Sequence, residues 1–152
     1  MKRKYIIGIL LIGLMATTAC VYAAETTLGD YKFNIPAGFE IAEQADDGIL
    51  LTKDNETEMV VQTSSSLNTE DEVVASLEEQ GMIVTAHQTI KTDDGEVIEA
   101  HYTDGTSQAS AYGWEVEDGK YIVCVYAYSL EGPAVEWDKS PAKTIHDTLT
   151  AK

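Results

Sequence analysis

The sequence has 152 residues, and its 26 acidic residues against 10 basic ones give a formal net charge of −16. This length predicts a single domain. A surface of this charge repels the phosphates of nucleic acids and the headgroups of anionic lipids, so a nucleic-acid partner is not expected.

The N-terminus has the layout of a secretory signal peptide. Residues 2–4 are basic, residues 5–15 form an apolar run, and small residues precede a cleavage site after Ala23 or Ala24. We therefore predict a signal peptide over residues 1–23. Residues 24–152 then form one domain with 7 basic residues against 26 acidic ones, a net charge of −19.

Two alternatives remain open for this leader. Residues 5–24 carry no charge and are long enough to span a bilayer, so an uncleaved leader would serve as an anchor. Cys20 follows Thr17-Thr18-Ala19, which loosely resembles a bacterial lipobox, although Thr stands where that motif prefers Leu. We expect a secreted protein or one on the outer face of the cytoplasmic membrane, with membrane contact only through an uncleaved or lipidated N-terminus.

The first half of the expected domain predicts short antiparallel strands. Residues 31–35 alternate apolar and polar side chains with a period of two, and Pro36 ends the pattern because proline has no N–H for a strand ladder. Residues 39–42, 49–53 and 58–64 predict further strands, separated by residues that favour turns.

A helix is predicted from Thr69 to Gln80. Thr69 and Glu72 form a capping box, in which each side chain accepts a hydrogen bond from a backbone N–H left free at the helix start. Gly81 supplies a left-handed stop. The apolar stripe of this helix consists of Val73, Val74 and Leu77.

Residues 83–130 predict a meander of four antiparallel strands. The three turns between the strands share one dipeptide, in Asp94-Gly95, Asp104-Gly105 and Asp118-Gly119. A type I′ turn needs a positive φ at both central positions, which glycine adopts freely and aspartate tolerates, so we expect two-residue type I′ hairpins.

The last two strands of the meander carry further information. The strand over residues 106–117 has large side chains on one face and small ones on the other, so we expect a close packing partner, a helix, on the small face. Residues 120–130 are apolar on both faces, which predicts a strand near the middle of the sheet with cover on both sides.

A second helix is predicted from Pro141 to Leu149, with Ser140 as its N-cap. The order is then strands, helix, four-strand meander, helix. This order predicts an α+β fold in which an antiparallel sheet is covered by two helices.

Residues 31–39, Tyr-Lys-Phe-Asn-Ile-Pro-Ala-Gly-Phe, resemble the opening motif of PsbP-like domains. That superfamily includes the extrinsic P subunit of photosystem II, a Ran-binding nuclear transport factor and small bacterial lipoproteins. The resemblance implies an antiparallel sheet sandwiched by helices over residues 31–149. The superfamily has no common active site, so the resemblance implies no site residues, and its mostly accessory or binding members imply that an enzyme is less expected.

The residues able to carry catalysis are few. Cys124 lies in mid-strand between two valines, where we expect a buried, inert thiol. Counting outward from Asp94-Gly95 pairs His87 with Tyr102 and His101 with Gln88, which puts these two histidines on opposite faces and argues against a shared metal site. The third imidazole is His146.

Acidic residues cluster at the predicted turns, around residues 46–47, 54–56, 93–96 and 115–118. Carboxylate oxygens suit Ca²⁺, but none of these clusters matches the 12-residue calcium loop, and hairpin turns themselves favour aspartate and glycine. No phosphate-binding glycine loop, Gly-x-Ser-x-Gly or His-Glu-x-x-His motif occurs in the sequence. No metal, cofactor or catalytic residue is therefore assigned.

The candidate residues of a ligand pocket are the aromatic side chains Tyr112, Trp114, Tyr126 and Tyr128. Packing beneath the helices accounts for most of this set, but a buried tyrosine hydroxyl needs a partner, so one or two are expected to reach a cleft.

These features predict an exported, acidic, non-catalytic accessory or binding protein of the cell envelope or extracellular space. Its partner is an unidentified protein or small molecule, and the acidic surface favours a cationic one. The alternative is a small secreted enzyme or a calcium-dependent protein that uses the acidic turns.

Overall fold

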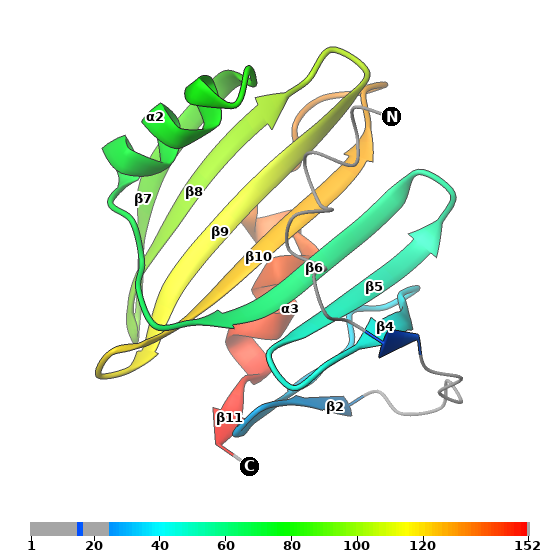
Figure 1. Cartoon of the computed structure of the whole chain (residues 1–152), viewed down its shortest axis with the longest axis vertical. Helices are drawn as coiled ribbons and strands as arrows, with labels where there is room; N and C mark the ends of the chain where they lie inside the picture. Colours follow the sequence, from blue (N-terminus) through cyan, green and yellow to red (C-terminus); the bar gives the residue numbers. More distant parts are fainter. Residues whose placement is uncertain (1–14, 17–24, 152) are drawn as a thin grey trace.

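One long antiparallel sheet organises the chain (Figure 1). The computed structural model describes residues 15–16 and 25–151, and the strand order of this sheet is β1-β4-β5-β6-β10-β9-β8-β7. Its strands are β1 (Met15–Ala16), β4 (Glu40–Gln44), β5 (Gly48–Asp54), β6 (Thr57–Ser64), β7 (Ile83–Thr92), β8 (Gly95–Thr103), β9 (Ser107–Glu117) and β10 (Lys120–Ser129). A second, three-stranded sheet has the order β11-β3-β2, with β2 (Glu25–Leu28), β3 (Tyr31–Asn34) and β11 (Thr150–Ala151).

Strand β10 joins the two halves of the large sheet. It pairs with β9, its neighbour in sequence, and with β6 from the first half of the chain. Val125, for example, lies between Val60 of β6 and Ala111 of β9. Cys124 and Ala127 are both fully buried although they face opposite sides of the sheet. The predicted central position of this strand is therefore confirmed.

The two predicted helices cover opposite faces of the sheet. Figure 1 shows α2 (Glu70–Glu79) in front of β7 and β8, and α3 (Pro141–Thr148) behind the sheet. The capping box of α2 is present, with Thr69 and Glu72 exchanging two hydrogen bonds of 3.3 Å. The hydroxyl of Ser140 accepts a hydrogen bond of 3.1 Å from the Ala142 N–H at the start of α3. A short 3-10 helix, η2 (Trp137–Lys139), precedes α3.

The two faces of the sheet differ in how many side chains are fully buried against them. The larger core lies between the sheet, α3 and the three-stranded sheet, and includes Phe33, Ile122 and Ile145 at 0% exposure. On the other face α2 contributes no fully buried residue. There Leu67, in the segment before α2, lies so close to Gly113 that a Cβ atom on this glycine would be 2.5 Å from Leu67 Cδ1. The close partner expected on the small face of β9 is thus largely this leucine.

The predicted type I′ turns are wrong. No non-glycine residue in the described part of the chain has a positive φ, whereas Gly95, Gly105 and Gly119 have φ values of 137°, 91° and 76°. In one of the three turns the aspartate acts through its side chain instead. Asp104 Oδ1 accepts a hydrogen bond of 2.8 Å from the backbone N–H of Thr106.

The predicted α+β fold, an antiparallel sheet with two helices, is confirmed, but the sheet was underestimated. The four-strand meander β7–β10 continues through β6, β5 and β4 into one larger sheet. Residues 25–28 form a strand that was not predicted from the sequence, and residues 31–34 belong to the separate small sheet.

Most of the leader, including Cys20 and the cleavage site, lies outside the described residues, so the signal peptide and the lipidation stay predictions. Within residues 15–16 and 25–151, no helix is both long and apolar enough to cross a bilayer.

Candidate functional site

A line of polar side chains crosses the core face of the meander. Gln88 of β7 lies opposite Glu99 of β8, and His101 of β8 lies opposite Ser110 of β9. Because side chains of a strand alternate between faces, Glu99 and His101 point to the same side. Tyr128 of β10 continues the line toward the segment that follows the sheet.

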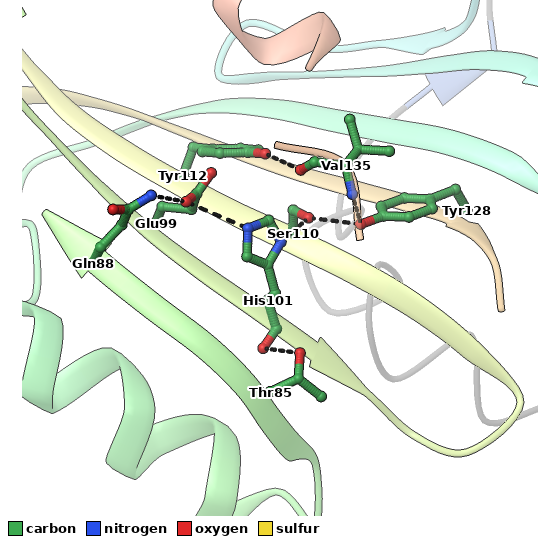
Figure 2. Close-up of polar contacts among 8 residues, drawn as sticks. All are labelled: Thr85, Gln88, Glu99, His101, Ser110, Tyr112, Tyr128 and Val135. Carbon is green, nitrogen blue, oxygen red and sulfur yellow. Dashed lines mark hydrogen bonds and ion pairs between the residues drawn. The ribbon is translucent and has the colours of Figure 1, made fainter. Parts of the chain in front are cut away.

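These groups form a continuous hydrogen-bonded chain (Figure 2). Glu99 Oε1 accepts a hydrogen bond of 2.8 Å from Gln88 Nε2 and lies 3.3 Å from His101 Nε2. His101 Nδ1 lies 2.6 Å from Ser110 Oγ, which lies 3.1 Å from the Tyr128 hydroxyl. These hydrogen bonds hold the carboxylate and the imidazole in the interior of the domain.

A backbone N–H fixes the direction of the hydrogen bonds along this row of side chains. The Val135 N–H donates to the Tyr128 hydroxyl oxygen at 2.9 Å, which leaves the hydroxyl hydrogen of Tyr128 for Ser110. Ser110 then donates to His101 Nδ1, and His101 donates from Nε2 to Glu99. This assignment keeps the lone pair of the imidazole away from the carboxylate, and it gives each hydroxyl one bond donated and one accepted.

Glu99 is the buried acidic group of this hydrogen-bonded chain. The residue is only 1% exposed. Burial acts to raise the pKa of Glu99, but the hydrogen bonds from His101 and Gln88 outweigh burial and hold this pKa below its ordinary value. The carboxylate is therefore ionised at neutral pH.

One oxygen of this carboxylate is left over. Glu99 Oε2 is buried and has no hydrogen-bond partner among the residues that the structure describes. A hydrogen-bonding interaction with the Tyr112 hydroxyl makes a smaller contribution to the lowered pKa of Glu99. By geometry, this hydroxyl donates to the carbonyl oxygen of Val135, 3.5 Å away (Figure 2). An unpaired buried oxygen of a charged group is costly, so Oε2 is a place for a ligand to bind.

Glu99 and His101 lie at the wall of a cleft of about 730 Å³. One side of this cleft, called the β7–β8 cleft below, is formed by residues 86–91 of β7, and the opposite side by residues 134 and 136–138. Apart from two histidines, the charged residues of the lining are one lysine, Lys91, and three acidic residues, Glu99, Glu136 and Asp138. The volume is that of a small-molecule site or of a pocket for one long side chain.

The serine, histidine and glutamate of the chain are ordered like a hydrolase triad, but the geometry does not support acyl transfer. Ser110 is 0% exposed and, unlike Glu99 and His101, does not line a cleft that a substrate carbonyl could enter. Its oxygen also accepts the Tyr128 hydrogen bond. The arrangement is suited to holding Glu99 and His101 in place and not to nucleophilic attack.

The histidines lie apart, as the sequence predicted. The hairpin register is shifted by two residues, so that His87 pairs with Ala100 and His101 pairs with Ala86. A shift of two keeps every side chain on its face, so His87 and His101 still face opposite sides. His87 contacts Glu70 at the start of α2. His146 contacts Asp147 and packs edge-on against Trp114.

Cys124 is buried with 0% exposure, as expected, and burial raises the pKa of its thiol. In the acidic turns, Asp54 Oδ1 accepts a hydrogen bond of 2.8 Å from the backbone N–H of Glu56, and Glu117 accepts a hydrogen bond from the Tyr31 hydroxyl. Across residues 15–16 and 25–151, no three histidine, cysteine or acidic side chains come together in a way that could hold a metal ion.

The four candidate aromatic residues lie on the core face of the sheet. Tyr112 and Trp114 pack against Trp137, with ring centroids 5.2 and 6.4 Å apart, and Tyr126 stacks on Tyr128 at 4.6 Å. The rings do not share one cavity: Trp114 and Tyr126 line two different pockets. A ligand role for this set stays a prediction.

Sequence reasoning assigned no role to Glu99, Gln88 or Ser110. The available signal was the C-terminal part of β8, residues 97–103, where Glu99 stands on the same face as Val97 and His101. A carboxylate between buried neighbours on one face of an inner strand indicates a satisfied buried charge or a site.

Comparison with known proteins supports the fold. No protein-family model and no curated protein matches the chain. Among solved structures, it is similar to the cyanobacterial PsbP (CyanoP) from Synechocystis sp. PCC 6803, with a TM-score of 0.54 and 14% sequence identity. The match covers 93% of this chain and 99% of that one. The predicted PsbP-like fold is thus confirmed, and at this identity the likeness does not extend to function.

Proposed function

We propose that the protein is an exported, non-catalytic accessory or binding protein, and that it binds its ligand or partner in the β7–β8 cleft. The observation that carries this proposal is the buried, ionised Glu99 with one unpaired oxygen at the wall of that cleft. The signal-peptide layout of residues 1–23 supports export.

Binding is favoured over catalysis by the state of the reactive groups. The Ser110 hydroxyl and the Cys124 thiol are both fully buried. A covalent mechanism needs an accessible nucleophile beside a base, and neither residue meets that requirement. The cleft instead offers a pre-formed hollow with a few fixed polar groups, which is the usual form of a binding site.

The role of the cleft as the binding site is tested by filling it with a larger side chain. Ala134 is an exposed residue of its lining, so Ala134→Phe places a ring in the hollow without disturbing the core. Ala37 is an exposed alanine that lines a different pocket, and Ala37→Phe is the matched control. A library of small charged and neutral fragments is screened by amide chemical-shift changes in the purified protein.

The proposal expects fragments that shift the amides of β7, β8 and residues 134–138, and it expects Ala134→Phe alone to abolish these shifts. Fragments that bind elsewhere, or no fragment at all, would overturn the cleft as the binding site. Export is tested separately by the intact mass of the protein recovered outside the cytoplasm, because cleavage, retention and lipidation of the leader give three different masses.

A further inference from the structure

We propose that the group received by the β7–β8 cleft is a primary alkylammonium, which donates a hydrogen bond to Glu99 Oε2. This inference rests on the proposed function and adds the chemical class of the ligand. The carrier of the ammonium is either a free amine or the side chain of a lysine.

The first argument is the unpaired acceptor. Glu99 is 1% exposed, and its Oε2 has no hydrogen-bond partner in the described part of the chain. An ionised oxygen in a low-dielectric interior is best satisfied by a cationic donor, because such hydrogen bonds are shorter and stronger than neutral ones. An anionic ligand would instead face the carboxylate with like charge.

The second argument separates ammonium from guanidinium. Glu99 Oε1 is already occupied by Gln88 at 2.8 Å and His101 at 3.3 Å, so one oxygen is left. A guanidinium binds a carboxylate best through two parallel hydrogen bonds to both oxygens, whereas an ammonium acts as a compact point donor. The free oxygen of Glu99 therefore suits an ammonium.

The third argument is the rest of the lining. Glu136 and Asp138 stand in the same cleft and, with Glu99, set three carboxylates against the one ammonium of Lys91, so the net field of the lining attracts a cation. Ala86, Ile90 and Trp137 also line the cleft and supply surface for a methylene chain. An alkyl chain that ends in an ammonium matches both parts of this lining.

The probes differ in one property at a time. Butylammonium and n-butanol share an alkyl chain and differ in charge, and blocked lysine and blocked arginine amino-acid amides compare the two cationic groups. Binding to the purified protein is followed by amide shifts and by the side-chain carboxyl carbon of Glu99. Cadaverine against the blocked lysine amide compares the free-amine source with the protein source.

Glu99→Gln removes the charge and keeps the shape, and Glu79→Gln removes an exposed carboxylate at the end of α2 as the matched control. We expect butylammonium to shift the Glu99 carboxyl carbon and to bind at least tenfold more weakly to Glu99→Gln, with Glu79→Gln unchanged. The blocked lysine amide should bind more tightly than the blocked arginine amide.

Equal affinity of butanol and butylammonium, or an unchanged Glu99 carboxyl carbon in the wild-type protein, would overturn the inference even where Glu99→Gln fails to fold. If neutral or anionic fragments shift the cleft amides while butylammonium does not, the cleft is a binding site, but the inference that its ligand is an ammonium is wrong. If no fragment shifts these amides, both the ammonium inference and the proposed function fail.

Discussion

The buried contact between Glu99 and His101 yields the sharpest stability prediction. Replacing His101 by leucine leaves Glu99 with Gln88 as its one remaining hydrogen-bond donor, at 1% exposure. A lost hydrogen bond to a charged group costs about 1.5–3 kcal/mol, and the burial of the Glu99 carboxylate places this loss at the upper end of that range. We therefore expect His101→Leu to lower the free energy of unfolding by about 3 kcal/mol, which corresponds to roughly 10 °C in Tm for a domain of this size.

The test is a double-mutant cycle with Glu99→Gln, which removes the charge but still accepts the Gln88 hydrogen bond. In the Glu99→Gln background, His101→Leu no longer strands a charge, so its cost should fall to about 1 kcal/mol. The coupling energy between Glu99 and His101 is then about 2 kcal/mol, measured by urea unfolding at pH 7 with tryptophan fluorescence.

The control is an exposed pair with the same separation. Lys120 Nζ and Glu117 Oε1 are also 3.3 Å apart, but both side chains are 53% exposed. Water screens such a pair, so its coupling should be below about 0.5 kcal/mol. Equal coupling in the two pairs would refute the reasoning, because burial would then add nothing to the contact.

The same contact predicts a pH dependence. The pKa of Glu99 is lowered in the folded protein, so its contribution to stability is present above the unfolded value and is lost as the pH falls through the folded value. The stability advantage of the wild type over Glu99→Gln should therefore shrink as the pH falls below 4.5, the ordinary pKa of a glutamate. A constant difference between pH 7 and pH 3 would contradict the assigned ionisation.

Three further outcomes are expected. Gly113→Ala should destabilise the protein by about 1–2 kcal/mol in urea, because its Cβ would lie 2.5 Å from Leu67 Cδ1, and Leu67→Ala should remove most of that cost. Burial and the hydrogen bond to Glu117 raise the pKa of Tyr31 from 10.0 to about 12, so stability held below pH 10 should decline as the pH rises through 12. Tyr31→Phe should lack that decline, and equal alkaline melting curves would speak against the contact. The buried Cys124 thiol should react with Ellman's reagent only when the protein unfolds; rapid labelling of native protein would show that β10 is exposed.

The features of the fold that came from local chemistry could be predicted from the sequence. The capping box at Thr69 and the Ser140-Pro141 start place both helices within a residue of the structure. The double apolar face of residues 120–129 places β10 in the centre of the sheet, because only an inner covered strand can be apolar on both sides.

The features of the fold that depend on contacts between distant residues could not be predicted from the sequence. Nothing in residues 57–64 indicates that β6 pairs with β10, because register between remote strands is set by packing and not by a turn. Asp-Gly indicated the positions of the turns but not their type, since the aspartates do not adopt the positive φ of a type I′ turn, and Asp104 bonds the turn backbone through its side chain. Glu99 was assigned no role because a carboxylate in a strand is ordinarily exposed.

The place of β10 bears on how the chain reaches its folded form. Its partners, β6 and β9, are made earlier, and until β10 emerges each presents an open row of backbone hydrogen-bonding groups. Because β10 follows both of its partners in the sequence, the large sheet cannot close until the chain has been synthesised through residue 129. The backbone edges of β6 and β9 therefore stay unpaired on that side until β10 docks between them.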